Sequence, residues 1–180
     1  MQPNRFRSGG KGESISYASA KTKLGWLMLA ATDSGVCFVH FGASRRALKQ
    51  ALADEFPEAS LSASNAQATA PLKLWLRELE QYLAARGPRP DLPLDLRGTA
   101  FQILVWKFLL QIPAGTVVSY AEVARGIGRP GAVRAAASAC GKNRIGVLIP
   151  CHRVLRGNGE LGGYRWGTDL KAALLANEGR

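Results

Sequence analysis

The sequence sets a candidate nucleophile, Cys151, directly before a candidate base, His152. The apolar residues 145–149 predict a buried strand, so the cysteine would follow Pro150 at a strand end. A free thiol has a pKa near ~8.5, and an imidazole that accepts its proton would raise the reactive fraction at neutral pH. Adjacent side chains often point apart, however, and the dipeptide alone is more typical of an unreactive structural cysteine.

A third group that orients the imidazole has to be acidic, and acidic residues are scarce in this half of the chain. Residues 96–180 carry 12 basic side chains and only four acidic ones, Glu122, Glu160, Asp169 and Glu178. Residues 1–95 carry 12 basic and 9 acidic side chains, so +8 of the net charge of +11 lies in the second half. Such a basic half indicates a polyanionic partner, because phosphate contacts release condensed counterions. A basic surface that serves only solubility is the alternative.

Composition and length set the broad class. The 180 residues suffice for one large core or two small domains, and 47% hydrophobic with 21% charged residues is typical of a soluble globular protein. No apolar run approaches the ~20 residues of a membrane helix, and the N-terminus lacks a secretory pattern, so we expect a cytoplasmic protein without membrane contact. Three cysteines are too few for a disulfide framework. Cys37 and His40 have a Cys-x-x-His spacing that could begin a zinc site, but a small buried Cys37 is preferred and no metal is expected.

The first half predicts a flexible leader followed by an α/β domain. Residues 1–13 are polar and glycine-rich, as in a leader, and residues 61–69 predict a loop. Three prolines within residues 87–93 mark a domain boundary, so we expect domains over residues 14–93 and 94–180. Strands are predicted over residues 15–17, 25–31 and 36–41, with a hairpin turn at 32–35, and helices over 44–56 and 71–85.

The second half predicts three helices, over residues 99–111, 120–127 and 131–140. Ser119 and Glu122 form a capping-box pattern at the start of the second helix. Two helices joined by a tight turn inside a basic half are typical of helix-turn-helix DNA binding. The third predicted helix carries Arg134 among alanines, which fits either close approach to a narrow groove or tight packing against neighbouring helices.

The second half as a whole resembles the O6-alkylguanine-DNA alkyltransferases, or methylated-DNA–protein-cysteine methyltransferases. The resemblance covers residues 96–180 in order and without a gap, whereas residues 14–95 resemble the family's N-terminal domain only in outline. Residues 94–101 and 163–167 are similar to the methyltransferase half of Ada-type proteins, and the leader is similar to the junction before it. The matching features are Pro150-Cys151-His152-Arg153-Val154, the helix-turn-helix with Tyr120 and Arg134, Asn143, Tyr164 and Asn177-Glu178-Gly179.

The resemblance implies both a fold and an activity. The fold would be α/β (α+β), with an N-terminal ribonuclease-H-like sheet-and-helix domain and a C-terminal winged-helix-like domain that carries the helix-turn-helix. The activity would be direct-reversal DNA repair, in which a methyl or larger alkyl group moves irreversibly from O6-alkylguanine to Cys151, so that each molecule acts once. O4-alkylthymine is a second candidate substrate. The partner would be double-stranded DNA containing O6-alkylguanine, bound by a monomer that needs no cofactor.

The resemblance also assigns catalytic roles. Cys151 would attack the alkyl carbon, and His152 would draw the thiol proton through a water while Glu178 orients the imidazole. Asn143 would brace the turn before the active site. Tyr120 would donate a hydrogen bond to guanine N3 and so stabilise the departing base.

Further residues would bind the base and the DNA. Backbone groups at Cys151, Val154 and Arg165 would hold the guanine edge, with Tyr164 as a wall of the pocket. Because O6 lies inside the stacked duplex, the nucleotide must be flipped out, and Arg134 would fill the vacated space from the minor groove. The other DNA contacts would come from Tyr120, Ala121, Arg129 and Ala135.

Three rival functions are weaker. A module that binds alkylated DNA without repairing it would lack the cysteine nucleophile that this chain has at position 151. A winged-helix regulator would make the Cys-His pair incidental. A cysteine hydrolase would need a glycine-rich oxyanion element and a separate histidine, and neither is convincing here.

Overall fold

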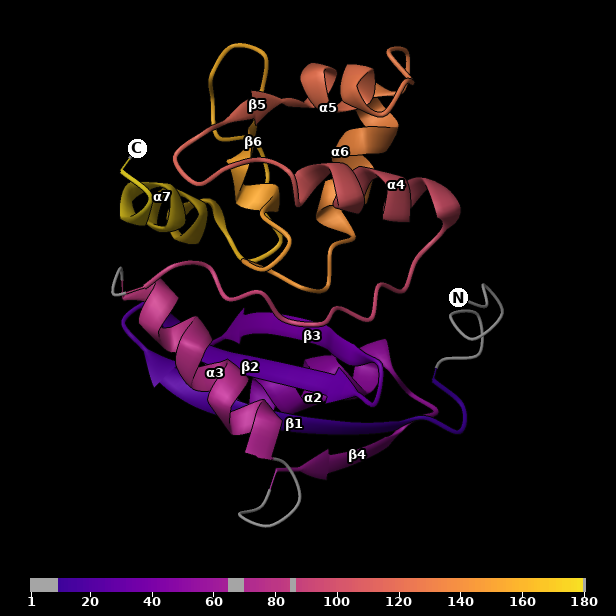
Figure 1. Ribbon diagram of the computed structural model, residues 1–180, viewed down its shortest axis with the longest axis vertical. Helices are drawn as coiled ribbons and strands as arrows, with labels where there is room; N and C mark the ends of the chain where they lie inside the picture. Colours follow the sequence, from indigo (N-terminus) through magenta and orange to yellow (C-terminus); the bar gives the residue numbers. More distant parts are fainter. Residues whose placement is uncertain (1–9, 65–69, 85–86, 180) are drawn as a thin grey trace. The chain divides into compact units, whose positions relative to one another are not determined.

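The computed structural model describes residues 10–64, 70–84 and 87–179, and the chain divides into two compact units, Met1–Arg97 and Gly98–Arg180. In Figure 1 the first unit carries the labels β1 to β4, α2 and α3, and the second carries β5, β6 and α4 to α7. Within the described ranges no helix combines the length and the apolar character needed to cross a membrane.

The first unit is built on a four-stranded sheet. β2 pairs antiparallel with β1 and with β3, while β4 pairs in parallel with β1, which gives the strand order β3-β2-β1-β4. With two helices beside this sheet, the mixed α/β class expected from the sequence is confirmed. The elements are β1 (Ser14–Thr22), β2 (Gly25–Thr32), β3 (Gly35–Gly42), α2 (Arg45–Glu55), β4 (Ser60–Ala63) and α3 (Ala70–Leu83).

Strands β2 and β3 are buried along nearly their whole length, so both faces of the sheet are covered. On one face Met28, Ala30 and Phe38 form a core with Leu48 and Leu52 of α2. Helix α3 packs against β1 and β2 (Figure 1). Cys37 lies in the α2 core, where its thiol donates to the Ala30 carbonyl at 3.6 Å, as expected for a packing cysteine.

Two segments of the first unit differ from the sequence prediction. Residues 60–63, placed mostly in a loop, form the edge strand β4, because backbone pairing with β1 needs no apolar alternation in a short Ser/Ala-rich segment. The rest of that predicted loop, residues 65–69, lies outside the described residues. Of the predicted leader, residues 1–9 also lie outside them, while residues 10–13 form a turn that Glu13 fastens through an ion pair with Arg97 at 3.2 Å.

The boundary between the units falls between residues 97 and 98 rather than after residue 93. Residues 94–97 stay with the first unit because their backbone continues the sheet. Leu94 forms a parallel bridge with Val36 of β3, and the Asp95 amide donates to the Val36 carbonyl. Thr32 donates to the Asp95 carboxylate at 2.8 Å, which fixes the same segment by its side chain.

The second unit is mainly helical. α5 and α6 form the helix-turn-helix, joined by a turn in which Gly128 has a positive φ of 70°. β5 and β6 pair in parallel and join the start of α5 to the residues that follow Cys151. The elements are α4 (Ala100–Leu109), β5 (Val118–Ser119), α5 (Tyr120–Gly126), α6 (Val133–Gly141), the 3-10 helix η1 (Cys151–Arg153), β6 (Val154–Leu155) and α7 (Thr168–Asn177).

The predicted strand over residues 145–149 is wrong. This segment is buried, as its apolar composition indicates, but it consists of tight turns rather than extended backbone. The Leu148 amide donates to the Gly146 carbonyl and the Ile149 amide to the Ile145 carbonyl, so these amides are satisfied within the turns; of the five residues only Ile145 forms a β-bridge. The pattern of a short apolar run cannot distinguish these two arrangements.

Candidate active site

Cys151 lies at the start of the helix η1 and is buried, with 4% of its surface exposed. The Asn143 amide donates to its Sγ at 3.1 Å. Burial raises the pKa of the thiol to about 11, against the lowering effects of this hydrogen bond and of nearby positive charges on Lys171 and Arg165. At neutral pH the sulfur is therefore almost entirely a thiol, and a base must remove its proton before it can act as a nucleophile.

Asn143 fixes the turn that positions Cys151. Its Oδ1 accepts from the Ile145 amide at 2.9 Å, and its Nδ2 donates to the Ile149 carbonyl at 3.0 Å as well as to Cys151. Within this closed loop Val147 has a φ of 69°, which is strained for a β-branched residue. The structure thus gives Asn143 a direct contact with the sulfur, in addition to the brace that sequence reasoning expected.

His152 is fully buried and pairs with Glu178, just beyond α7, at 3.0 Å between Nε2 and Oε1. Burial lowers the pKa of His152 more than Glu178 raises it, so the ring is neutral at pH 7. A carboxylate can only accept, so Nε2 carries the proton and Nδ1 is the basic nitrogen. Nδ1 is buried and has no hydrogen-bond partner among the residues that the structure describes.

Arg153, which sequence reasoning named only as part of a motif, completes this buried cluster. Its Nε donates to Glu178 Oε2 at 2.9 Å and its Nη2 to Oε1 at 2.7 Å, while Nη1 donates to the Ile112 carbonyl. The Gly115 amide also donates to Glu178 at 3.3 Å. The carboxylate that orients His152 is therefore itself held by a bidentate guanidinium, an arrangement of high geometric specificity.

Cys151 opens onto a cavity of about 530 Å³ within the second unit. Burial raises the pKa of Tyr120 to about 12 and that of Tyr164 well above its ordinary value, so both phenols remain protonated and can donate. The Tyr164 hydroxyl is buried without a hydrogen-bond partner among the described residues. The lining residues are Tyr120, Ala137, Cys140, Gly141, Cys151, Arg156, Gly162, Gly163, Tyr164 and Arg165.

The structure brings most, but not all, of the predicted base-binding residues to this cavity. Tyr120, Tyr164 and Arg165 line it, and Arg165 also donates to the Asn143 carbonyl at 3.4 Å. Val154 is not among the lining residues; it is buried in β6, and its carbonyl accepts from Lys171 at 2.6 Å. Neither Lys171 nor Arg153 was singled out from the sequence, since a buried charge leaves no periodic signal.

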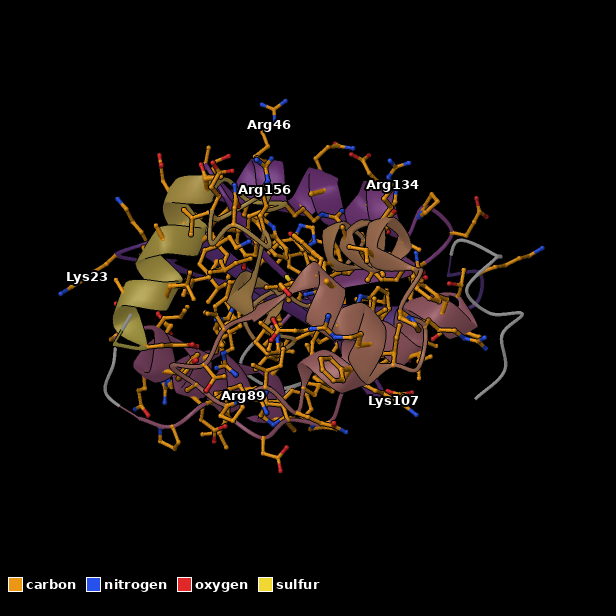
Figure 2. The ribbon with its side chains drawn as sticks, turned by 90° about the horizontal axis from the view of Figure 1, so that it is seen from above. Lys23, Arg46, Arg89, Lys107, Arg134 and Arg156 are labelled. Carbon is orange, nitrogen blue, oxygen red and sulfur yellow. The ribbon has the colours of Figure 1, made fainter. Side chains whose placement is uncertain are left out.

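The helix-turn-helix lies in the same unit as the cavity. Arg134 is exposed on α6 and extends outward (Figure 2), and Ala135 and Arg129 are exposed near it. Ala136 and Ala139 on the same helix are buried. The packing interpretation of the alanines is therefore confirmed for one face of α6, while the other face is exposed around Arg134 and its approach to a groove stays a prediction.

Fold and site together define a helix-turn-helix protein with a buried cysteine that opens onto a cavity in the same unit. Two family models match the chain: the "6-O-methylguanine DNA methyltransferase, ribonuclease-like domain" over residues 15–96 and the "DNA binding domain" of the same name over residues 100–180. The chain belongs to the 6-O-methylguanine DNA methyltransferase family.

Relatives span both short and long proteins. The chain is 44% identical over 99% of its length to the bifunctional transcriptional activator/DNA repair enzyme Ada of Escherichia coli, but covers only 49% of that protein. It is 35% identical to a methylated-DNA–protein-cysteine methyltransferase of Methanosarcina acetivorans, covering 91% of this chain and 97% of the relative. The crystal structure of Mycobacterium tuberculosis OGT in complex with DNA matches with a TM-score of 0.74 at 35% identity, over 91% of this chain and 92% of that one. The chain thus spans about half the length of the Ada-type relatives.

Proposed function

We propose that this chain repairs DNA by direct reversal: it transfers a methyl or larger alkyl group from O6 of guanine to Cys151 Sγ, once per molecule. The observation that carries the proposal is a buried thiol that faces a cavity with two protonated phenols and is followed by a His-Glu pair. Membership of the family supports the same reaction. O4-alkylthymine is a second candidate substrate of the same site.

In the proposed mechanism His152 Nδ1 takes the thiol proton through a water, and Glu178 stabilises the imidazolium that forms. The Asn143 amide, 3.1 Å from the sulfur, stabilises the thiolate. The thiolate attacks the alkyl carbon in line, the C–O6 bond breaks, and the electron pair leaves on the guanine. Tyr120 donates a hydrogen bond to the departing base. The product is a thioether, which thiol exchange cannot reverse, so the protein is consumed.

The proposed DNA contacts belong to the helix-turn-helix. O6 is inaccessible inside the duplex, so the nucleotide must rotate into the cavity at a cost of a few kcal/mol. The smooth exposed face of α6 suits the narrow minor groove, and Arg134 is the side chain that would fill the space the base leaves. Tyr120, Ala121, Arg129 and Ala135 would contact the flanking backbone. We place this activity in the cytoplasm, with the DNA, and in a monomer.

An intact-mass experiment tests the reaction. The protein is incubated with a duplex oligonucleotide containing O6-methylguanine, and its mass is measured before and after digestion. We expect a gain of one methyl group on the peptide that contains Cys151, and none in Cys151→Ala, which should still bind the duplex. A folded wild-type protein that binds this duplex and keeps its original mass would refute the transfer.

A second comparison tests the role of Arg134. Arg134→Ala should lose much of its transfer rate on duplex DNA but keep its rate with free O6-methylguanine, because only the duplex requires flipping. An equal loss on both substrates would show that Arg134 does not act in base extrusion.

A further inference from the structure

Lys171 is a buried lysine for which the mechanism above has no use. It lies on α7, and none of its surface is exposed. Lysine is among the residues least often fully buried, because the ammonium loses its hydration. This burial lowers the pKa of Lys171. The cost of burying the Lys171 ammonium must therefore be offset by the hydrogen bonds that it donates.

The contacts of Lys171 join two segments of the cavity. Its Nζ donates to the Val154 carbonyl at 2.6 Å and also to the Leu161 carbonyl. Val154 directly follows the short helix that begins with Cys151. Leu161 directly precedes residues 162–165, which line the cavity. One ammonium therefore connects the nucleophile segment to the loop that forms another part of the cavity wall.

Backbone hydrogen bonds from Gly159 to Arg156 and from Arg156 to Glu160 close this loop on itself, whereas the Lys171 contact joins it to the segment after Cys151. The loop contains four glycines between residues 157 and 163, and Gly159 and Gly162 have positive φ values of 84° and 65°. Glycine gives up more conformational freedom on ordering than any other residue, so this loop is costly to hold in one shape. An ion pair between Arg156 and Glu160 spans the loop, but both side chains are 60% exposed, which makes it weak.

We propose that Lys171 is a positioning residue of the transfer site, whose ammonium clamps the loop 161–165 to the segment that carries Cys151 and so sets the cavity for the flipped base. The proposal rests on the function proposed above, because it specifies how that site receives its substrate. The lysine has a second effect through its charge. The positive charge of Lys171 lowers the pKa of Cys151, which favours the thiolate.

Substitution of Lys171 in the full chain separates these two effects. Lys171→Met removes the donor and the charge, and Lys171→Gln keeps a donor without the charge. Lys107→Met is the matched control, because Lys107 is exposed on α4 of the same unit (Figure 2). Three readouts are needed: amide hydrogen exchange of residues 161–165, the pH dependence of Cys151 alkylation by iodoacetamide, and methyl transfer from the O6-methylguanine duplex.

For Lys171→Met we expect amide exchange in the loop to accelerate about tenfold or more, as for the loss of a charge-assisted hydrogen bond. The profile of iodoacetamide alkylation against pH should move to higher pH, because the thiol loses a nearby positive charge and less of it ionises at a given pH. Transfer at subsaturating duplex should fall by at least about tenfold, since both effects act on it. In Lys171→Gln the alkylation profile should move to higher pH as in Lys171→Met, but the amide exchange of the loop should change less, because the glutamine still donates. Lys107→Met should match the wild type in all three readouts.

The result that overturns the proposal is a folded Lys171→Met or Lys171→Gln protein with wild-type exchange at residues 161–165 and a wild-type pH profile. If the methionine variant does not fold, the glutamine variant decides by the same two readouts. Neither readout involves alkylguanine. A wild-type protein that failed to accept methyl from the duplex would therefore refute the proposed function. The amide exchange of residues 161–165 and the pH profile of iodoacetamide alkylation would still show whether Lys171 positions the loop.

Discussion

Glu178 is shared between His152 and Arg153, and both neighbours contribute, after burial, to the protonation of the histidine. The guanidinium takes both carboxylate oxygens, at 2.7 and 2.9 Å, and the imidazole takes one of them at 3.0 Å. Glu178 raises the pKa of His152, whereas the charge of Arg153 and above all burial lower it. Burial, helped by the charge of Arg153, thus keeps His152 neutral beside the carboxylate and able to accept a proton.

Arg153→Met should lose both stability and reactivity. It leaves the Glu178 carboxylate buried without its guanidinium, and breaking a buried pair in this way costs about 3–5 kcal/mol in the free energy of unfolding. The pKa of His152 should rise, so that less of the neutral base is present near pH 7 and transfer slows. Urea unfolding measures the first effect, and an NMR titration of the His152 ring measures the second.

The control for Arg153→Met is Glu160→Gln. It breaks the Arg156–Glu160 pair, whose side chains are 60% exposed, against 2% and 4% for Arg153 and Glu178. Solvent screens the exposed pair, so unfolding of this variant should be unchanged. An Arg153→Met protein as stable as Glu160→Gln, with an unmoved His152 titration, would contradict the shared-carboxylate argument.

At the scale of elements, the sequence predicts those helices whose ends are marked by side chains. Ser119 and Glu122 form both halves of the expected capping box, and α5 begins directly after it at Tyr120. A buried apolar run is a less certain guide: it predicted β2 and β3 correctly but failed at the apolar turns of residues 145–149. Helix α7 was not predicted either, because its apolar residues are spread around the helix and form no stripe.

In the site, too, residues that belong to a sequence motif could be predicted, whereas residues defined only by their burial could not. Cys151, His152 and Glu178 were expected from the family motif, and the structure pairs His152 with Glu178 and places Cys151 at the start of the same short helix as His152. The proton path from Cys151 to His152 stays a prediction. Arg153 and Lys171 were missed, because whether a basic side chain is exposed or buried depends on tertiary contacts made by residues far away in the sequence. For Arg153 one such contact is the Ile112 carbonyl, 41 residues away.

Helix α5 lies close to α4, and Gly126 at the end of α5 leaves no room for a side chain beside Phe108. A Cβ at Gly126 would come within 2.1 Å of the Phe108 ring. Gly126→Ala should therefore destabilise the unit by about 1–3 kcal/mol in urea unfolding, as overpacking does. Adding Phe108→Leu should recover part of this loss, because a smaller side chain leaves room for the methyl group.

Gly141→Ala provides the comparison for Gly126→Ala. Gly141 ends α6, and a Cβ there would have no atom within 4 Å. In open space an alanine is the better helix former, so unfolding should become less favourable by about 0.5–1 kcal/mol. Equal responses at the two glycines would mean that helix propensity, and not the contact between α4 and α5, decides the outcome.

For the molecule as a whole, the buried thiols should make the free energy of unfolding fall as the pH rises above 9. Burial raises the pKa of Cys37 from its ordinary 9.0 to about 12. Below pH 9 both the folded and unfolded states keep this proton, and the thiol has no effect on pH dependence. Above pH 9 only the unfolded state releases it, so stability falls by about 1.4 kcal/mol per pH unit until the folded thiol also ionises.

Cys37→Ala removes this contribution and should flatten the pH dependence. The variant has a constant cost from the lost side-chain volume, but the stability advantage of the wild type should shrink by about 2 kcal/mol between pH 9 and 10.5. Urea unfolding of both proteins at the two pH values measures the difference. An advantage that stays constant would show that the folded state does not protect the Cys37 proton.

The uneven charge of the chain predicts how DNA binding responds to salt. Residues 96–180 contribute +8 of the net charge of +11, so the phosphate contacts should come mainly from the second unit. Each contact adds about 0.9 to the slope of log affinity against log salt. Arg129→Ala should lower the magnitude of that slope by about 0.9, since Arg129 is the arginine proposed to contact the DNA backbone.

Arg46→Ala is the matched control for this titration, because Arg46 is exposed on α2 of the first unit (Figure 2). It removes the same charge from the whole protein as Arg129→Ala does, so an effect of net charge alone would change both slopes alike. We expect the Arg46→Ala slope to equal that of the wild type, since counterions are released only where a side chain meets a phosphate. A slope lowered as much by Arg46→Ala as by Arg129→Ala would extend the DNA-binding surface to the sheet unit, and the helix-turn-helix alone would no longer account for the salt dependence.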